Sequence, residues 1–153
     1  ETYKQVLSRR NTSAQHLLDF LQDLLDDSCS GAAKPLLIRA VLRLSRVSGR
    51  HPRCFAVTDL KKEGTQVAAG YSSDLWKRSF RGKDVSIKIM RLFETSDIRV
   101  LLQEFSREAL IWRQLSHPNL LPFFGLYYLD RRLCLISPWM QNGNILAYLR
   151  NKP

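Results

Sequence analysis

Val85-Ser86-Ile87-Lys88-Ile89-Met90-Arg91 alternates apolar residues with Ser86 and Lys88, the period-two pattern of a half-buried β-strand. Lys88 therefore points to the face opposite Ile87. From Ile98 onward the apolar spacing changes to three and four residues, which predicts one long helix. The apolar residues of this helix are Ile98, Leu101, Leu102, Phe105, Ala109, Trp112 and Leu115.

Glu108 falls inside the apolar arc of the predicted helix. A carboxylate that points toward a core needs a cationic partner, because burying it unpaired costs several kcal/mol. We expect this partner to be Lys88 on the preceding strand. Two alternatives remain open: Lys88 is a solvated strand lysine, or Glu108 bonds another cation and Glu104, one turn earlier, takes its place.

Four short motifs occur in a fixed order within this strand, within this helix and in the segment after them. They are Ser86-Ile87-Lys88, Arg107-Glu108-Ala109-Leu110, Leu115-Ser116-His117-Pro118-Asn119-Leu120-Leu121 and Leu135-Ile136-Ser137-Pro138-Trp139-Met140. Through them the chain from Val67 to Leu149 resembles the N-terminal lobe of a protein kinase, close to the tyrosine-kinase-like group expanded in mushroom-forming fungi. The resemblance implies an α+β fold, in which one long helix packs across a small antiparallel sheet of about five strands.

In the resembled family, a strand lysine paired with a helix glutamate positions the phosphates of ATP. The resemblance therefore implies that Lys88 contacts the α- and β-phosphates and that Glu108 orients Lys88. Glu108 lies nine residues before His117, which is the family's spacing, and Glu104 does not.

The segment 67–77 takes the place of the family's glycine-rich loop. Its three glycine positions are Ala68, Gly70 and Ser73, so only the middle glycine is kept. Taken alone, the segment also fits an ordinary hairpin turn. The resemblance implies that Ser137 guards the back of the adenine pocket. It also implies that the Pro138 carbonyl and the Met140 N–H form hydrogen bonds with adenine. The residues that the resemblance assigns to ATP binding are Val67, Ala68, Gly70, Ser73, Leu75, Ser86, Lys88, Glu108, Ser137, Pro138 and Met140.

Three segments precede or begin the kinase-like part, which we place at residues 54–150. Residues 1–12 are polar and are expected to be flexible, and residues 13–50 predict a helical hairpin. Cys54–Thr58 is a candidate strand. The second helix of the hairpin carries a basic face made of Arg39, Arg43 and Arg46, with Arg50 just beyond it.

This basic face has two interpretations. Either it tracks phosphates or a membrane surface, or it pairs with the acidic first helix. In the second case an antiparallel turn sets Asp27 near Arg39 and Asp23 near Arg43, and each exposed pair is worth at most about 1 kcal/mol.

The composition suits a single domain, because the 153 residues are 44% hydrophobic, which is enough for one core. The net charge of +10 would suit a phosphate-bearing ligand or an acidic partner. Three scattered cysteines, Cys29, Cys54 and Cys134, favour reduced thiols over disulfides or a metal site, so a cytoplasmic or nuclear location is expected.

The catalytic motifs of a kinase are missing from this sequence. Kinases orient the substrate hydroxyl with a catalytic-loop Asp and hold Mg²⁺ with a further Asp and an Asn, but neither His-Arg-Asp nor Asp-Phe-Gly occurs here. We therefore expect a piece of a kinase, or a truncated product, without the C-terminal lobe. Such a chain has no catalytic residue and no metal site, and is inactive alone. Mg²⁺ and a protein substrate would be needed only by a complete parent.

The leading hypothesis is an ATP-binding N-terminal lobe of a Ser/Thr or Tyr protein kinase. The eroded glycine loop favours an alternative, a non-catalytic pseudokinase or scaffold module. A third hypothesis is a basic helix that binds nucleic acid or an anionic membrane, with a steep salt dependence that Lys88→Met does not change. A detached lobe would also expose apolar surface and self-associate.

Overall fold

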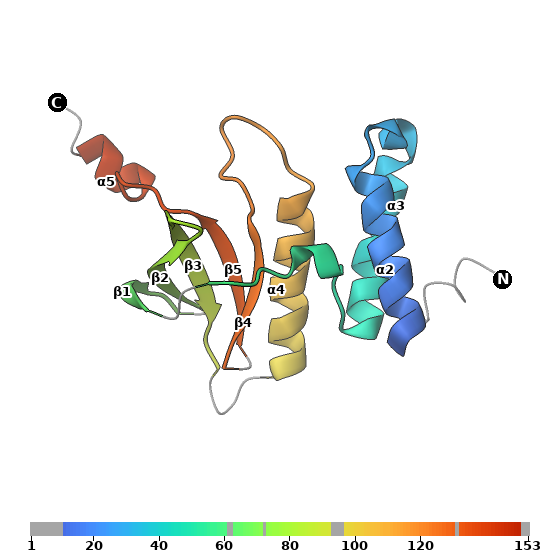
Figure 1. Cartoon of the computed structure of the whole chain (residues 1–153), viewed down its shortest axis with the longest axis horizontal. Helices are drawn as coiled ribbons and strands as arrows, with labels where there is room; N and C mark the ends of the chain where they lie inside the picture. Colours follow the sequence, from blue (N-terminus) through green and yellow to red (C-terminus); the bar gives the residue numbers. More distant parts are fainter. Residues whose placement is uncertain (1–10, 61–62, 72, 93–96, 131, 151–153) are drawn as a thin grey trace.

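The computed structural model describes residues 11–60, 63–71, 73–92, 97–130 and 132–150, so most of the expected flexible N-terminus lies outside the described residues. Figure 1 shows three layers: a twisted sheet, one long helix across it, and a pair of helices beyond that helix. The helices are α2 (Asn11–Asp26), η1 (Ser28–Ala33), α3 (Lys34–Ser48), η2 (Arg53–Phe55), α4 (Ile98–Arg113) and α5 (Ile145–Arg150). The strands are β1 (Gly64–Ala69), β2 (Ser73–Phe80), β3 (Lys83–Met90), β4 (Gly125–Leu129) and β5 (Arg132–Pro138).

The five strands form one antiparallel sheet in the order β1-β2-β3-β5-β4, which confirms the predicted α+β class. β3 lies at the centre, and its period-two pattern places alternate side chains on opposite faces. Val85, Ile87 and Ile89 are buried on one face beside Cys134 and Ile136.

The other face of the sheet packs against α4. Met90 of β3 and Leu135 of β5 are buried there in one cluster with Phe105 and Ala109 of α4. Lys88 shares this face of β3, at the point where cover by α4 begins. The predicted helix therefore packs on the predicted strand, with Lys88 at the edge of the contact.

The helical hairpin is present and joins the same core. Leu18 and Leu25 of α2 and Val41 and Leu44 of α3 belong to the cluster that contains Phe105 of α4. Within the described residues, the first helix of the hairpin covers Asn11–Asp26, which includes the predicted start at residue 13. No helix in the described part of the chain is long and apolar enough to cross a membrane.

The charge pairing predicted within the hairpin is wrong. In the described residues, no ion pair joins Asp27 to Arg39 or Asp23 to Arg43. The carboxylates of α2 that do form ion pairs reach outside the hairpin: Asp19 to Arg53 after α3, and Asp26 to Arg113 of α4.

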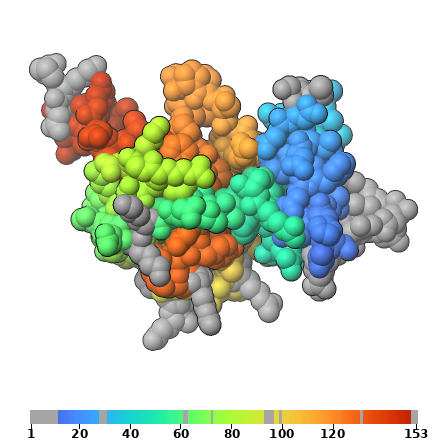
Figure 2. All heavy atoms as spheres, viewed as in Figure 1, coloured from blue at the N-terminus to red at the C-terminus, as the bar shows by residue number. Residues whose placement is uncertain are grey.

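The segment after α3 crosses the sheet without becoming one of its strands (Figure 2). The strand predicted at Cys54–Thr58 is wrong, because the 3₁₀ turn η2 keeps hydrogen bonds local at Phe55 and Ala56. One parallel bridge, Ala56 to Leu126, and the 2.7 Å bond from Val57 N–H to the Leu126 carbonyl attach the segment to β4.

Candidate functional site

Lys88 and Glu108 form the predicted ion pair. The Lys88 Nζ lies 2.8 Å from Oε1 and 2.9 Å from Oε2 of Glu108, so both carboxylate oxygens accept from one ammonium. The two side chains come from β3 and α4, twenty residues apart, and are 34% and 40% exposed. The contact of Lys88 with Glu108 rules out the alternative in which Glu104, which is exposed, takes the place of Glu108.

The surroundings of Lys88 orient its amine without burying it. The ring of Phe105, one turn before Ala109 on α4, lies 5.4 Å from the Lys88 Nζ, within cation–π range. An ammonium has three N–H donors, and Glu108 supplies two acceptor oxygens. A partly exposed ion pair is worth at most about 1 kcal/mol, so it adds little to stability while holding a cation at a fixed position.

The strand register places Ala68, Leu75, Ser86 and Ser137 on the same face as Lys88, whereas Pro138 pairs with Val85 of the opposite face. Directly opposed residues of antiparallel strands share a face. One row runs from Ala68 through Leu75 and Lys88 to Leu135. Where β3 meets β5, the next row on this face pairs Ser86 with Ser137.

The exposure of these residues changes along the same face. Ser137 is buried, at 5% exposed, whereas Leu75 and Ser86 are half-buried. The part of this face near β2 therefore remains accessible, and Lys88 stands between it and the part covered by α4.

The turn between β1 and β2 occupies the place of the predicted phosphate-covering loop. The Gly70 N–H donates to the Ser73 carbonyl at 2.9 Å, and a Cβ on Gly70 would lie 2.9 Å from that same oxygen. A larger residue would have to open this tight turn, which accounts for the one retained glycine. Val67 stands at a register shift between Gln66 and Ala68 and is 49% exposed.

An ion-pair cluster beside this turn was not predicted from the sequence. Asp74 accepts from Arg91 Nε at 2.8 Å and from Gln66 Nε2 at 3.2 Å, and Arg91 Nη2 lies 2.6 Å from the same carboxylate. This cluster ties β1, β2 and the end of β3 together at the base of the turn. Residues 66, 74 and 91 follow no common period, so only the sheet register brings them together.

The predicted hinge follows β5 and is fixed to the β2–β3 hairpin. The Trp139 N–H donates to the Asp84 carbonyl at 3.2 Å, and the Asp84 carboxylate lies 2.7 Å from Lys77 Nζ. Lys77 also lies 5.4 Å from the centroid of the Trp139 ring. Pro138 is half-buried at the end of β5, and Met140 is 54% exposed.

The far side of α4 is held by the hairpin. Gln114, just after α4, donates from Nε2 to Oε1 of the fully buried Gln22 at 3.0 Å. Gln22 in turn donates to Asp26 at 2.9 Å, and Arg113 donates to the other oxygen of Asp26 at 2.9 Å. These bonds link the C-terminal end of α4 to α2.

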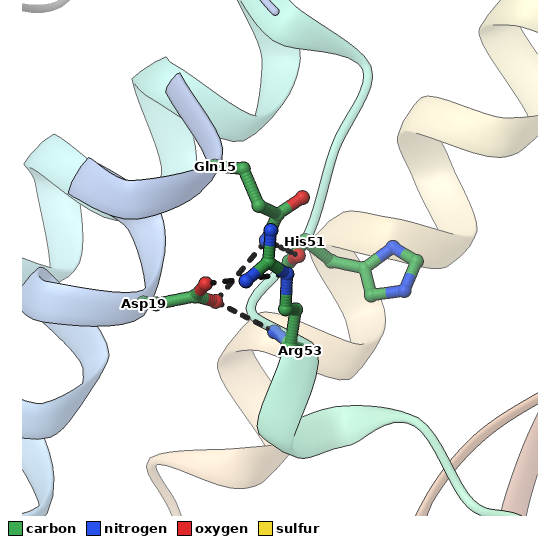
Figure 3. A network of polar contacts seen from close by, with 4 residues as sticks. All are labelled: Gln15, Asp19, His51 and Arg53. Carbon is green, nitrogen blue, oxygen red and sulfur yellow. Dashed lines mark hydrogen bonds and ion pairs between the residues drawn. The ribbon is translucent and has the colours of Figure 1, made fainter. Parts of the chain in front are cut away.

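A second polar network holds α2 against the segment that follows α3 (Figure 3). Gln15 Nε2 donates to the His51 carbonyl at 2.9 Å and to Asp19 at 3.1 Å, and the Arg53 N–H donates to Asp19 at 2.7 Å. The His51 ring stacks on Tyr128 of β4. Burial of the imidazole lowers the pKa of His51. The hairpin is thus attached to both α4 and the sheet.

Potential metal ligands do not gather in the described part of the chain. Among residues 11–60, 63–71, 73–92, 97–130 and 132–150, no group of three or more His, Cys, Asp and Glu side chains is placed to hold a metal ion. His117 instead accepts at Nδ1 from the Asn119 N–H at 3.1 Å, a structural bond within the turn after α4.

Known proteins match the part of the chain that contains this site. The sequence model of the family described as "Protein tyrosine and serine/threonine kinase" matches residues 62–153. The serine/threonine-protein kinase STY46 of Arabidopsis thaliana is 29% identical over 92 residues, which cover 60% of this chain and 16% of the relative.

Two further relatives show the same partial coverage. The probable serine/threonine-protein kinase drkB of Dictyostelium discoideum is 25% identical over 91 residues, covering 60% of this chain and 13% of the relative. The serine/threonine/tyrosine-protein kinase HT1 of Arabidopsis thaliana is 28% identical over 91 residues, covering 58% and 23%. The chain thus spans less than a quarter of the length of these three relatives.

Proposed function

The chain belongs to the family of protein tyrosine and serine/threonine kinases, and on this basis we propose that its sheet and α4 bind ATP as the N-terminal lobe of such an enzyme. The observation that carries the proposal is the bidentate contact of Glu108 with Lys88. It supports an amine oriented to meet the α- and β-phosphates, with Glu108 fixing its direction.

The accessible part of the sheet face near β2 is where we place the adenine base. In the proposal, adenine lies against Leu75 and Ser86 with Ser137 behind it, and the Pro138 carbonyl and Met140 N–H bond its edge. The turn at Gly70 lies above the phosphates. Since two of the three glycine positions are Ala68 and Ser73, we expect fewer backbone contacts to phosphate than a full glycine-rich loop makes.

Phosphoryl transfer to a protein hydroxyl is proposed only for a parent that also supplies the catalytic loop. Mg²⁺ accompanies ATP in protein kinases. Among the described residues of this chain no group of three metal-ligand side chains occurs, and none of these residues is assigned as a Mg²⁺ ligand. Its own contribution is to bind the nucleotide and orient the phosphates.

Calorimetric titration with Mg-ATP and with adenosine tests the proposal. Lys88→Met removes the cation, and one charge-assisted hydrogen bond is worth about 1.5–3 kcal/mol, so ATP affinity should fall roughly 10- to 100-fold. Adenosine affinity should stay unchanged. Lys83→Met, at the exposed start of β3, is the matched control and should leave both affinities intact. ATP binding that Lys88→Met does not weaken would contradict the proposal.

A further inference from the structure

The outer face of α3 carries a row of cations. At 100° per residue, Arg39, Arg43 and Arg46 point within an arc of roughly 60°, and Arg50 follows directly after the Gly49 C-cap. All four arginines are exposed. We call Arg39, Arg43, Arg46 and Arg50 the α3 basic stripe.

None of the described carboxylates neutralises this stripe. In the part of the chain that the structure describes, no ion pair joins any of the four guanidinium groups to a carboxylate. The nearby acidic helix α2 directs Asp19 to Arg53 and Asp26 to Arg113. Among the described residues, the ion pairs that would have tied the stripe to the hairpin are therefore not formed, and the charge of the stripe faces outward.

Two apolar side chains accompany the arginines. Leu36 and Val47 are 64% and 41% exposed, and on a helix they point within about 20° of each other and within about 40° of Arg43. The buried face of α3, which includes Val41 and Leu44, packs into the core. Leu36 and Val47 are thus exposed apolar groups between the arginines and the buried face of an already anchored helix.

We propose that the α3 basic stripe docks on an anionic lipid membrane, with Leu36 and Val47 entering the boundary between headgroups and acyl chains. A cationic helix face bordered by exposed apolar residues is typical of helices that lie in the membrane interface. Nucleic-acid binding uses the cations but gives no role to the exposed Leu36 and Val47. The surface is separate from the candidate nucleotide site, because α4 lies between α3 and the sheet (Figure 1).

Sedimentation of the chain with vesicles tests this proposal. The vesicles contain about 30% phosphatidylserine in phosphatidylcholine, with pure phosphatidylcholine as reference. An arginine near an anionic surface contributes roughly fivefold in affinity, so changing all four stripe arginines to Gln should lower binding by two to three orders of magnitude. Leu36→Ser with Val47→Ser should lower it about tenfold or more while leaving heparin binding unchanged.

A charge-matched control separates the stripe from the high net charge. Its four substitutions to Gln fall on exposed cations elsewhere, namely Arg81, Lys83, Arg107 and Arg150. We expect this control to retain most vesicle binding, and Lys88→Met to retain all of it. Circular dichroism of each variant checks that the helices remain folded.

Three results would overturn the proposal. The first is an absence of binding to the anionic vesicles. The second is an equal loss of binding in the stripe variant and the charge-matched control, which would show that only net charge acts. The third is equally tight binding to a short DNA duplex with vesicle binding insensitive to Leu36 and Val47, which would assign the stripe to nucleic acid.

Discussion

Gln114→Ala tests how α4 is held against the hairpin. Gln22 is fully buried, and its amide oxygen accepts from Gln114 Nε2 at 3.0 Å. Removing the donor leaves a buried carbonyl oxygen unpaired, which costs about 1–3 kcal/mol. Arg113→Ala breaks a shorter contact to Asp26, at 2.9 Å, but those side chains are 41% and 38% exposed, so its cost stays below about 1 kcal/mol. We therefore expect Gln114→Ala to be the more destabilising change.

Urea unfolding followed by circular dichroism measures the free energies of unfolding of Gln114→Ala and Arg113→Ala. An unchanged denaturant slope shows that both variants expose the same surface on unfolding. The double variant Gln22→Leu with Gln114→Leu supplies the control. Replacing both partners by apolar groups of similar size leaves neither amide with an unpaired buried donor or acceptor. Asp26 loses its bond from Gln22, but its side chain is 38% exposed and water can replace that donor, so the pair should cost less than Gln114→Ala alone. A larger loss of unfolding free energy for Arg113→Ala than for Gln114→Ala would refute the assignment of this energy to the buried amide pair. So would a double variant that costs as much as Gln22→Leu and Gln114→Leu added together.

Three further predictions concern the rest of the fold. Gly125 has φ of +146°, and a Cβ there would lie 2.6 Å from the Phe55 carbonyl oxygen. Gly125→Ala should therefore lower the free energy of unfolding by more than about 2 kcal/mol in thermal unfolding. Gly82→Ala should lower it by about 1 kcal/mol, because an added Cβ at Gly82 meets no atom within 4 Å. Burial lowers the pKa of His51 from 6.5, so the unfolded chain binds this proton more readily and stability falls as the pH drops below 6.5; His51→Phe should flatten that dependence in urea titrations on either side of this pH. Cys134 is buried, and burial raises the pKa of its thiol to about 11, whereas Cys54 is exposed. In a Cys29→Ser variant, iodoacetamide should therefore label Cys54 in the folded chain and Cys134 only after unfolding.

The sequence predicts the centre of this fold well because the signals there are local. The period of two in β3 and the spacing of three and four in α4 each define a buried face within one segment. Placing Lys88 and Glu108 together required one further step, the spacing from Glu108 to His117. That spacing carries the resemblance, and the observed ion pair agrees with it.

Predictions that depended on tertiary placement were less successful. Cys54–Thr58 has the composition of a strand, but Phe55 is buried through the turn η2, and the segment gains only one bridge to β4. The charges of the hairpin form a second case. Helical spacing shows that Asp23 and Arg43 lie on the surface, but not that α2 directs its ion-paired carboxylates to Arg53 and Arg113. Which exposed charges meet depends on how whole elements pack.

The position of α4, and with it that of Glu108, depends more on apolar contacts than on the ion pair. The Lys88–Glu108 pair is more than one-third exposed on average, so it contributes at most about 1 kcal/mol to holding the helix. The buried apolar contacts of Phe105 and Ala109, each in the cluster shared with the hairpin and the sheet, are individually worth as much or more. The core and the hairpin therefore fix α4, and the ion pair forms as a result. In the proposed site, the third N–H of Lys88 can then donate to a phosphate while Glu108 accepts from the other two, without loosening the fold.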